Sequence, residues 1–162
     1  MKTYRRQFSR ARTAQHGFTM TELLVVLIIV AILASLAAPS FSQLIRSQKI
    51  KSMATDINAS LTRARSEAIK RNRNVTLSPL IAGSWHSGWQ IADPDNAGTY
   101  IEVHPAILGL TGSGPDSVTY QSSGRIQGTT APAFNISATG ISDQRCVSVD
   151  LSGRPHVRAA EC

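Results

Sequence analysis

The sequence predicts an α+β fold in which a long N-terminal helix packs against an antiparallel β-sheet head. Three observations lead to this class. An apolar run fills residues 18–38, a helical apolar period continues to residue 73, and short alternating segments between turn residues fill 74–162. A helix followed by such strands is typical of an α+β domain whose sheet covers the apolar stripe of the helix.

The apolar run at residues 18–38 predicts a membrane-spanning helix. It contains 21 residues and a single charge, Glu22. As a helix it would be about 31 Å long, which matches the hydrocarbon core of a bilayer. The segment therefore qualifies as a transmembrane anchor, with Glu22 as an unusual feature.

The segment before this helix, residues 1–17, is a predicted targeting leader with five basic residues and no acid. Positive charge before a membrane helix holds that end in the cytoplasm, so residues 40–162 are predicted to lie outside. The rest of the chain sets 12 basic residues against ten acidic ones, so the net charge of +7 does not by itself imply a nucleic-acid partner. The five basic residues are Lys2, Arg5, Arg6, Arg10 and Arg12.

Pro39 follows the apolar run directly and lacks a backbone donor, so it is expected to kink the helix. The alternative is that Pro39 ends the membrane helix. Continuation is favoured because residues 40–73 contain no Gly or Pro and repeat apolar residues at steps of three or four. These are Ile50, Met53, Ile57, Leu61, Ala64 and Ala68. The whole helix, residues 18–73, would be about 84 Å long.

The polar face of the second helical half, residues 39–73, is basic. It carries Arg63, Arg65, Lys70, Arg71 and Arg73. A DNA-binding face is one hypothesis. The favoured alternative is a solvated face on which Glu67 pairs with Lys70 and Arg71, three and four residues further on.

From residue 74 the apolar period changes to two, which predicts β-strands. The alternating segments are residues 75–77, 89–91, 100–103, 118–120, 134–136 and 147–151. The glycine-containing stretch at residues 109–114 is expected to be a mobile loop. Trp85 and Trp89 are expected in the core, because large aromatic side chains in small domains are usually buried.

The two cysteines, Cys146 and Cys162, are expected to form a disulfide. The head is predicted to be exported, and two cysteines allow one pairing. Free thiols or metal ligands are the weaker alternative, since two cysteines without a neighbouring histidine pair make a poor zinc site.

A secretory signal peptide is one interpretation of the N-terminus, with small residues Ser35 and Ala37 spaced for cleavage after Ala37. Gly17 and Glu22 argue against it. An acid inside an apolar helix is costly and marks a functional residue by default, although Glu22 could also extend to the headgroups.

Residues 17–22, G-F-T-M-T-E, resemble the processing site of type IV prepilins and pseudopilins. The resemblance implies that a prepilin peptidase cuts between Gly17 and Phe18 and that its methyltransferase activity methylates Phe18. It also implies that Pro39 stands at the family's helix proline. Glu22 would neutralise the N-terminal amine of a neighbouring subunit, so that neither charge stays unpaired in the membrane.

Two further passages are similar to the GspH/FimT branch, which comprises minor pseudopilins of type II secretion and minor pilins of type IV pili. They are residues 61–71 followed by 75–79, and residues 85–91, W-H-S-G-W-Q-I. The resemblance implies the type IV pilin-like fold and a minor subunit that helps to initiate or cap a pilus or pseudopilus with other pilins. It also implies a single-pass protein of the bacterial inner membrane with a periplasmic head.

A calcium site is suggested by Asp93, Asp95 and Gly98, whose spacing matches the start of a calcium loop. The pattern fails at its fifth and twelfth positions, which are Ala97 and His104. A turn with an Asx hydrogen bond is expected instead. We predict no metal site and no cofactor.

The C-terminal tail predicts a hairpin that turns at residues 152–153. Arg154, His156 and Arg158 would point to one side and could follow a phosphate backbone, lightly helped by Arg125 and Arg145. FimT-type pilins that take up DNA carry a Gly-Arg-x-Arg tail motif, from which this chain departs at His156. The favoured interpretation is an exposed strand whose charges discourage edge pairing.

The sequence contains no catalytic constellation. Its histidines are scattered, and it has no phosphate-loop, serine-hydrolase or zinc-protease motif. The predicted function is therefore a structural minor pilin or pseudopilin, a substrate of the prepilin peptidase rather than an enzyme. Two alternatives stay open: a DNA-capturing minor pilin, and a periplasmic binding protein with an ordinary signal peptide.

Overall fold

The computed structural model describes residues 17–162, without the side chains of residues 37–39. The predicted leader, apart from Gly17, and the side chain of Pro39 lie outside this description. The chain divides into two compact units, Met1–Pro39 and Ser40–Cys162. Each unit is described by itself.

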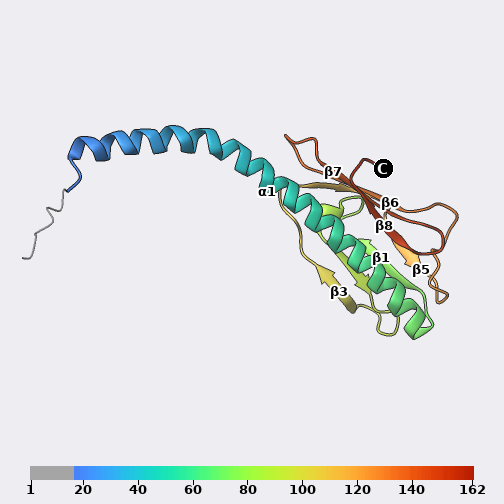
Figure 1. Ribbon diagram of the computed structural model, residues 1–162. Helices are drawn as coiled ribbons and strands as arrows, with labels where there is room; N and C mark the ends of the chain where they lie inside the picture. Colours follow the sequence, from blue (N-terminus) through green and yellow to red (C-terminus); the bar gives the residue numbers. More distant parts are fainter. Residues whose placement is uncertain (1–16) are drawn as a thin grey trace, which may run out of the picture. The chain divides into compact units, whose positions relative to one another are not determined.

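One α-helix, α1, is assigned from Met20 to Arg71 (Figure 1). The sequence predicted residues 18–73, so the helix is shorter by two residues at each end. Asn72 ends it with a positive φ of 52°. The N–H groups of Asn72 and Arg73 donate to the carbonyls of Ile69 and Ala68, at 3.3 and 3.2 Å, which is a Schellman motif.

In the first unit, α1 exposes its large apolar side chains over the whole described stretch. By length and composition this helix could cross a membrane. A continuous apolar surface of this kind is unfavourable in water. It therefore needs lipid or other protein subunits to cover it.

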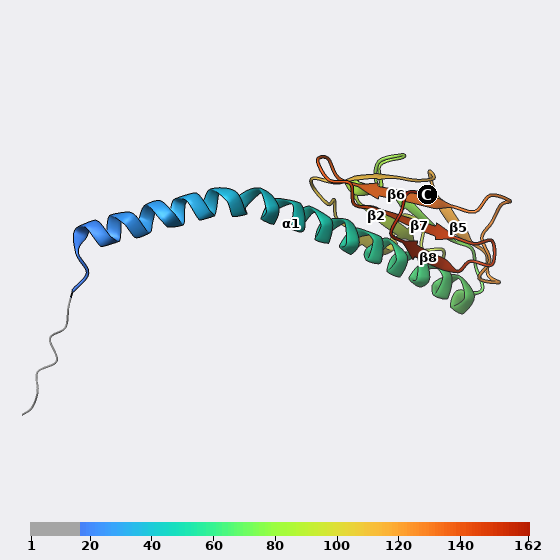
Figure 2. The same ribbon diagram turned by 45° about the horizontal axis from the view of Figure 1, so that its top comes forward.

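The second unit combines the rest of α1 with two four-stranded antiparallel sheets (Figure 2). The first sheet has the order β3-β2-β1-β5, with β1 at Val75–Pro79, β2 at Trp89–Ala92, β3 at Tyr100–His104 and β5 at Val118–Tyr120. The second has the order β4-β6-β7-β8, with β4 at Thr111–Ser113, β6 at Ala133–Ser137, β7 at Gln144–Val149 and β8 at Pro155–Arg158. A short 3-10 helix, η1 at Trp85–Ser87, precedes β2. The α+β class is confirmed, but the single sheet we expected is two sheets.

The expectation of a mobile loop at residues 109–114 is wrong, because β4 lies within this stretch and pairs with β6. Gly112 explains the difference. A Cβ at this position would lie 2.5 Å from the Met53 side chain and 3.1 Å from the backbone nitrogen of His86. Glycine lets the strand approach α1 and η1 closely, and its lack of a side chain hides the alternation from the sequence.

The core lies between α1 and the sheets. All six predicted stripe residues of α1 are fully buried, and so are Trp85 and Trp89. Trp85 meets Phe134 of β6 edge to face, with ring centroids 4.6 Å apart. Because Phe134 belongs to the second sheet and Trp89 to the first, these aromatic side chains join both sheets in one core.

Candidate functional site

Thr19 and Glu22 form a capping box at the start of α1. The Thr19 N–H and hydroxyl donate to Glu22 Oε2 at 2.8 and 2.9 Å, and the Glu22 N–H donates to Thr19 Oγ1 at 3.2 Å. Thr19 is thus the N-cap and Glu22 the third helical residue. This arrangement explains why the helix begins at Met20 rather than at Phe18.

The capping box was missed in the sequence, although the signature Thr-x-x-Glu is present at residues 19–22. Both contacts of the Glu22 carboxylate use Oε2. Within residues 17–162, no hydrogen bond or ion pair is made by Oε1. The carboxylate is therefore held at the helix end with one oxygen still able to accept a donor.

The basic face of α1 holds the head together. Each of its five cations contacts a partner: Arg63 with Glu102 (3.0 Å), Arg65 with the Gly124 carbonyl (3.0 Å), Lys70 with Glu67 (3.9 Å), Arg71 with Glu67 (2.7 Å) and Arg73 with Asp95 (3.3 Å). The predicted pairs of Glu67 are confirmed. The contacts to the head were missed because they join residues far apart in the sequence. Each cation of this face thus has a protein partner, although Arg63, Lys70 and Arg73 keep exposed side chains.

Arg71 occupies the turn where calcium had been considered. Its Nη1 lies 2.8 Å from both Asp93 Oδ1 and Asp95 Oδ2. The Asp95 N–H donates to Asp93 at 2.9 Å, which is the expected Asx turn. That backbone bond, helped by Arg71, lowers the pKa of Asp93. A fixed guanidinium supplies the positive charge here, and no metal-binding group of side chains occurs within residues 17–162.

The tail forms the predicted hairpin between β7 and β8, but Arg154 lies before β8 and not in it. His156 and Arg158 pair with Ser148 and Cys146, while Val157 pairs with buried Val147. Paired residues of antiparallel strands share a face. His156 and Arg158 therefore point outward together, and Val157 points to the other face as predicted.

The charges of the tail are partly neutralised by Asp150. His156 Nε2 lies 3.4 Å from Asp150 Oδ2. The Ser152 hydroxyl and the Arg154 N–H also donate to this carboxylate, and they hold its pKa well below its usual range. The Arg158 side chain has no described partner. An ionised acid beside the cations weakens their attraction for a phosphate backbone.

Of the two arginines expected to help the tail, Arg125 follows Gly124, which lies against Gly153 at the turn. Gly124 and Gly153 touch, since a Cβ on Gly153 would lie 2.0 Å from the Gly124 carbonyl oxygen. Arg145 lies on β7 next to Cys146, which pairs with Arg158, and its guanidinium binds Asp143 at 2.6 Å. The charge of Arg145 is already paired with Asp143, and its help to the tail stays a prediction.

Cys146 and Cys162 form a disulfide, as predicted. The bond ties the last residues of the chain to β7. The Asn135 side chain of β6 also donates to Glu161, at 3.4 Å. The C-terminal segment is therefore fixed to the outer side of the second sheet.

Solved structures share this fold. Two crystal structures of the type IV minor pilin FimU from Pseudomonas aeruginosa align with TM-scores of 0.59 and 0.61 at 24% identity, over 67% and 68% of this chain and 91% and 89% of theirs. The minor pseudopilin EpsH of the Vibrio cholerae type 2 secretion system aligns with a TM-score of 0.54 at 16% identity, over 68% of this chain and 97% of its own. At these identities the likeness concerns the fold alone. No curated protein matches the chain.

The fold and the capped apolar helix define a type IV pilin-like subunit. Residues 12–38 match the model of the prokaryotic N-terminal methylation motif. Residues 53–153 match the model described as type II transport protein GspH, and the chain belongs to this family. It is a structural subunit of a pilus or pseudopilus, anchored by its apolar helix. The resemblance to the GspH/FimT branch is confirmed.

Proposed function

We propose that this chain is a minor subunit that is cut between Gly17 and Phe18, methylated on Phe18 and then built into a filament through Glu22. The observation that carries the proposal is the Glu22 carboxylate at the start of α1, with Oε1 unpartnered among the described residues. The cut would create an ammonium group at Phe18. A neighbouring subunit could then place this cation against Glu22.

Electrostatics favour such a pairing inside the apolar surroundings of the helices. A lone carboxylate or ammonium in a membrane is costly, and removing one partner of a buried pair costs about 3–5 kcal/mol. Each subunit carries both groups, so a stack of subunits can satisfy every one of them except at its end. The pairing would therefore favour addition of a subunit in one register.

The membrane orientation and the place in the filament belong to the same proposal. The basic leader supports a cytoplasmic N-terminus and a periplasmic head. The fold shared with a minor pilin and a minor pseudopilin supports a minor subunit rather than one that forms the bulk of the fibre. Starting or capping assembly is the role proposed for it. The subunit would act as a substrate of the prepilin peptidase and have no catalytic activity of its own.

Mass spectrometry of the mature N-terminus tests the proposal. A chain that begins at methylated Phe18 supports it, whereas one that begins at Ala38 or Pro39 supports an ordinary signal peptide. Two matched variants sharpen the result, because each peptidase needs a small residue before its own cut. Gly17→Val should block processing, and Ala37→Val should leave it unchanged.

DNA capture by the tail is a second candidate. The outward position of the Arg158 side chain supports it, since this cation has no partner within residues 17–162. The Arg154 side chain is exposed as well. The contact of His156 with Asp150 weighs against it.

A further inference from the structure

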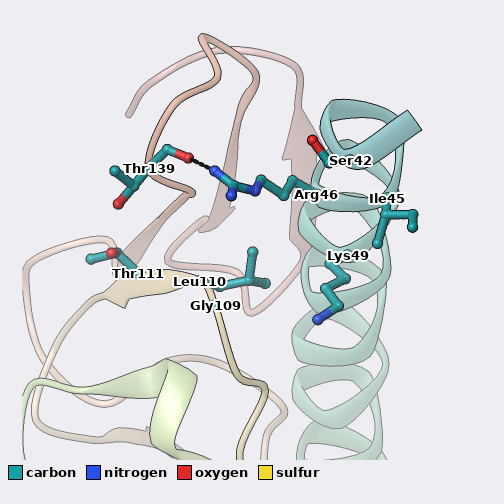
Figure 3. A pocket seen from close by; sticks show the side chains of 8 residues that line it. All are labelled: Ser42, Ile45, Arg46, Lys49, Gly109, Leu110, Thr111 and Thr139. Carbon is teal, nitrogen blue, oxygen red and sulfur yellow. Dashed lines mark hydrogen bonds between the residues drawn. The ribbon is translucent and has the colours of Figure 1, made fainter. Parts of the chain in front are cut away.

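A cavity of about 460 Å³ lies in the second unit, between α1 and the segments that precede β4 and β7 (Figure 3). Arg46 and Lys49 border it from α1, and Thr111 borders it from β4. Its wall carries two cationic side chains and no acidic one. The cavity therefore offers positive charge to a small anionic group.

Both cations use only part of their donor capacity on the protein. Arg46 donates from Nη1 to the Thr139 carbonyl (Figure 3), and Lys49 donates from Nζ to the Leu108 carbonyl at 3.2 Å. A guanidinium has five N–H donors and an ammonium has three. Their other donors have no acceptor in the described part of the chain. These two contacts fix the stems of both side chains and leave donors for a ligand.

The acid at this end of the head is already occupied. Asp143 accepts from the Ser47 hydroxyl at 2.5 Å and from Arg145 at 2.6 Å. These contacts hold the pKa of Asp143 below its ordinary value, with the Ser47 bond as the largest cause. Asp143 is therefore not left to neutralise Arg46 or Lys49.

Exposed apolar side chains stand beside the cations. Ile45, which lines the cavity from α1, is 43% exposed, and Leu108, whose carbonyl accepts a hydrogen bond from Lys49, is 80% exposed. Cationic groups flanked by exposed apolar side chains are typical of protein surfaces that lie in the headgroup layer of a membrane. This combination favours lipid over a purely aqueous anion.

The cavity also lies within reach of a bilayer. Arg46 follows the end of the predicted span, Ala38, by eight residues. Eight residues cover about 12 Å as a helix and at most about 28 Å when extended. Arg46 therefore lies at most about 28 Å from the end of the predicted span, which brings the headgroup layer within reach.

We propose that this cavity binds the phosphate of an anionic phospholipid and docks the head on the membrane surface before the subunit enters a filament. Arg46 binds the phosphate with paired N–H groups, and Lys49 adds a point charge. Leu110, in the cavity wall, contacts the glycerol region. This docking rests on the proposed membrane-anchored state of the subunit.

Native mass spectrometry of the full-length protein in detergent, with phosphatidylglycerol or phosphatidylcholine added, tests the proposal. A cation at an anionic membrane surface contributes about fivefold, so two give a preference of roughly 30-fold for phosphatidylglycerol. Arg46→Gln with Lys49→Gln should abolish this preference. The exchange Arg46→Lys with Lys49→Arg keeps both charges and should retain most of it.

A matched control removes two charges from the same helix outside the cavity, with Lys51→Gln and Lys70→Gln. It should leave the preference unchanged. An equal loss in the control would indicate diffuse attraction and overturn the proposal, as would equal retention of both lipids by the unmodified protein. If the cavity variant keeps its lipid preference but no longer enters filaments, the occupant is a neighbouring subunit. The mature N-terminus is measured separately, so failure of the proposed processing would not be confused with failure of lipid binding.

Discussion

The indole nitrogen of Trp89 donates a hydrogen bond to the hydroxyl of Ser60, at 2.9 Å, inside the core. Ser60 is 3% exposed, and its hydroxyl donates a hydrogen bond to Glu102 Oε1 at 2.6 Å. Arg63 binds the other oxygen of this carboxylate. One polar network thus ties α1 to β2 and β3 in the middle of an apolar interface.

Ser60→Ala should lower the free energy of unfolding by about 1–3 kcal/mol, because the buried indole N–H would lose its acceptor. Urea titration of the full-length protein in detergent, followed by tryptophan fluorescence, measures the change. Ser66→Ala is the control, since Ser66 is exposed and bonds only to the Arg63 carbonyl. Equal stability of the Ser60 variant and the unmodified protein would contradict a structural role for this network.

The contacts of Arg71 with acidic side chains should make the stability of the head depend on pH. Hydrogen bonding to Arg71 lowers the pKa of Glu67, and the Asp95 N–H together with Arg71 lowers that of Asp93. A lowered folded-state pKa adds stability above the unfolded value of about 4, and this stability is lost as pH falls through the folded value. The melting temperature should therefore drop between about pH 5 and about pH 2.

Arg71→Ala should lower the melting temperature near neutral pH and flatten this acid-side drop, because the contacts of Arg71 with Glu67 and Asp93 are then absent at every pH. Lys70→Ala is the control, since Lys70 is more exposed and lies 3.9 Å from Glu67. An unchanged pH profile in the Arg71 variant would contradict the role given to Arg71 in this pH dependence.

Added calcium should not raise the melting temperature of the unmodified protein, because the Arg71 guanidinium already binds both Asp93 and Asp95.

Loss of the Cys146–Cys162 disulfide should destabilise the head by about 3 kcal/mol, the value expected for closure of a loop of this length. The melting temperature of a variant with both cysteines replaced by serine is compared with that of the unmodified protein. Dithiothreitol should lower the melting temperature of the unmodified protein and leave that of the double variant unchanged. Sensitivity of the double variant to the reductant would point to some other effect.

Glu22→Gln separates capping from charge. Glutamine can also serve in a capping box, so the helix start and the cut before Phe18 should persist. The variant lacks the charge that would meet a neighbour's ammonium. Its amount in sheared filaments should fall at least about tenfold, since an unpaired buried charge is strongly unfavourable. Normal entry of the processed variant into filaments would refute the proposed pairing.

The tail should bind DNA only weakly. Two free arginines correspond to a slope of about −2 in a plot of log affinity against log salt. Gel shifts with the full-length protein should therefore show binding at low salt only, and Arg154→Ala with Arg158→Ala should remove it. Lys70→Ala with Arg73→Ala is a charge-matched control. Binding that survives in the tail variant would place the contact elsewhere.

Local patterns were enough to predict several parts of this molecule. The steps of three and four residues identified the buried stripe of α1, and the Asx turn at Asp93 followed from turn chemistry. The paired charges around Glu67 lie within one helical turn of each other. In each case the interaction joins residues that are close in the sequence, so its geometry follows from helix or turn periodicity.

Contacts across long separations could not be predicted in this way. Gly112 carries no apolar signal, yet its strand completes the second sheet beside Met53 and His86. The anchoring of the head by Arg63 and Arg65 depends on which loops return to α1. The same holds for the cavity at Arg46, whose wall comes from three separate segments.

By itself the sequence determined the apolar helix with its single acid, the class of fold and the disulfide, because these depend on composition, period and cysteine count. Only the tertiary structure decided that the strands form two sheets, that Arg71 fills the acidic turn, and that Arg63 pairs with Glu102 of β3. The physical reason is that ion pairs and strand pairs form between groups that lie close together in space. For residues far apart in the sequence, this proximity is established only when the whole core has packed.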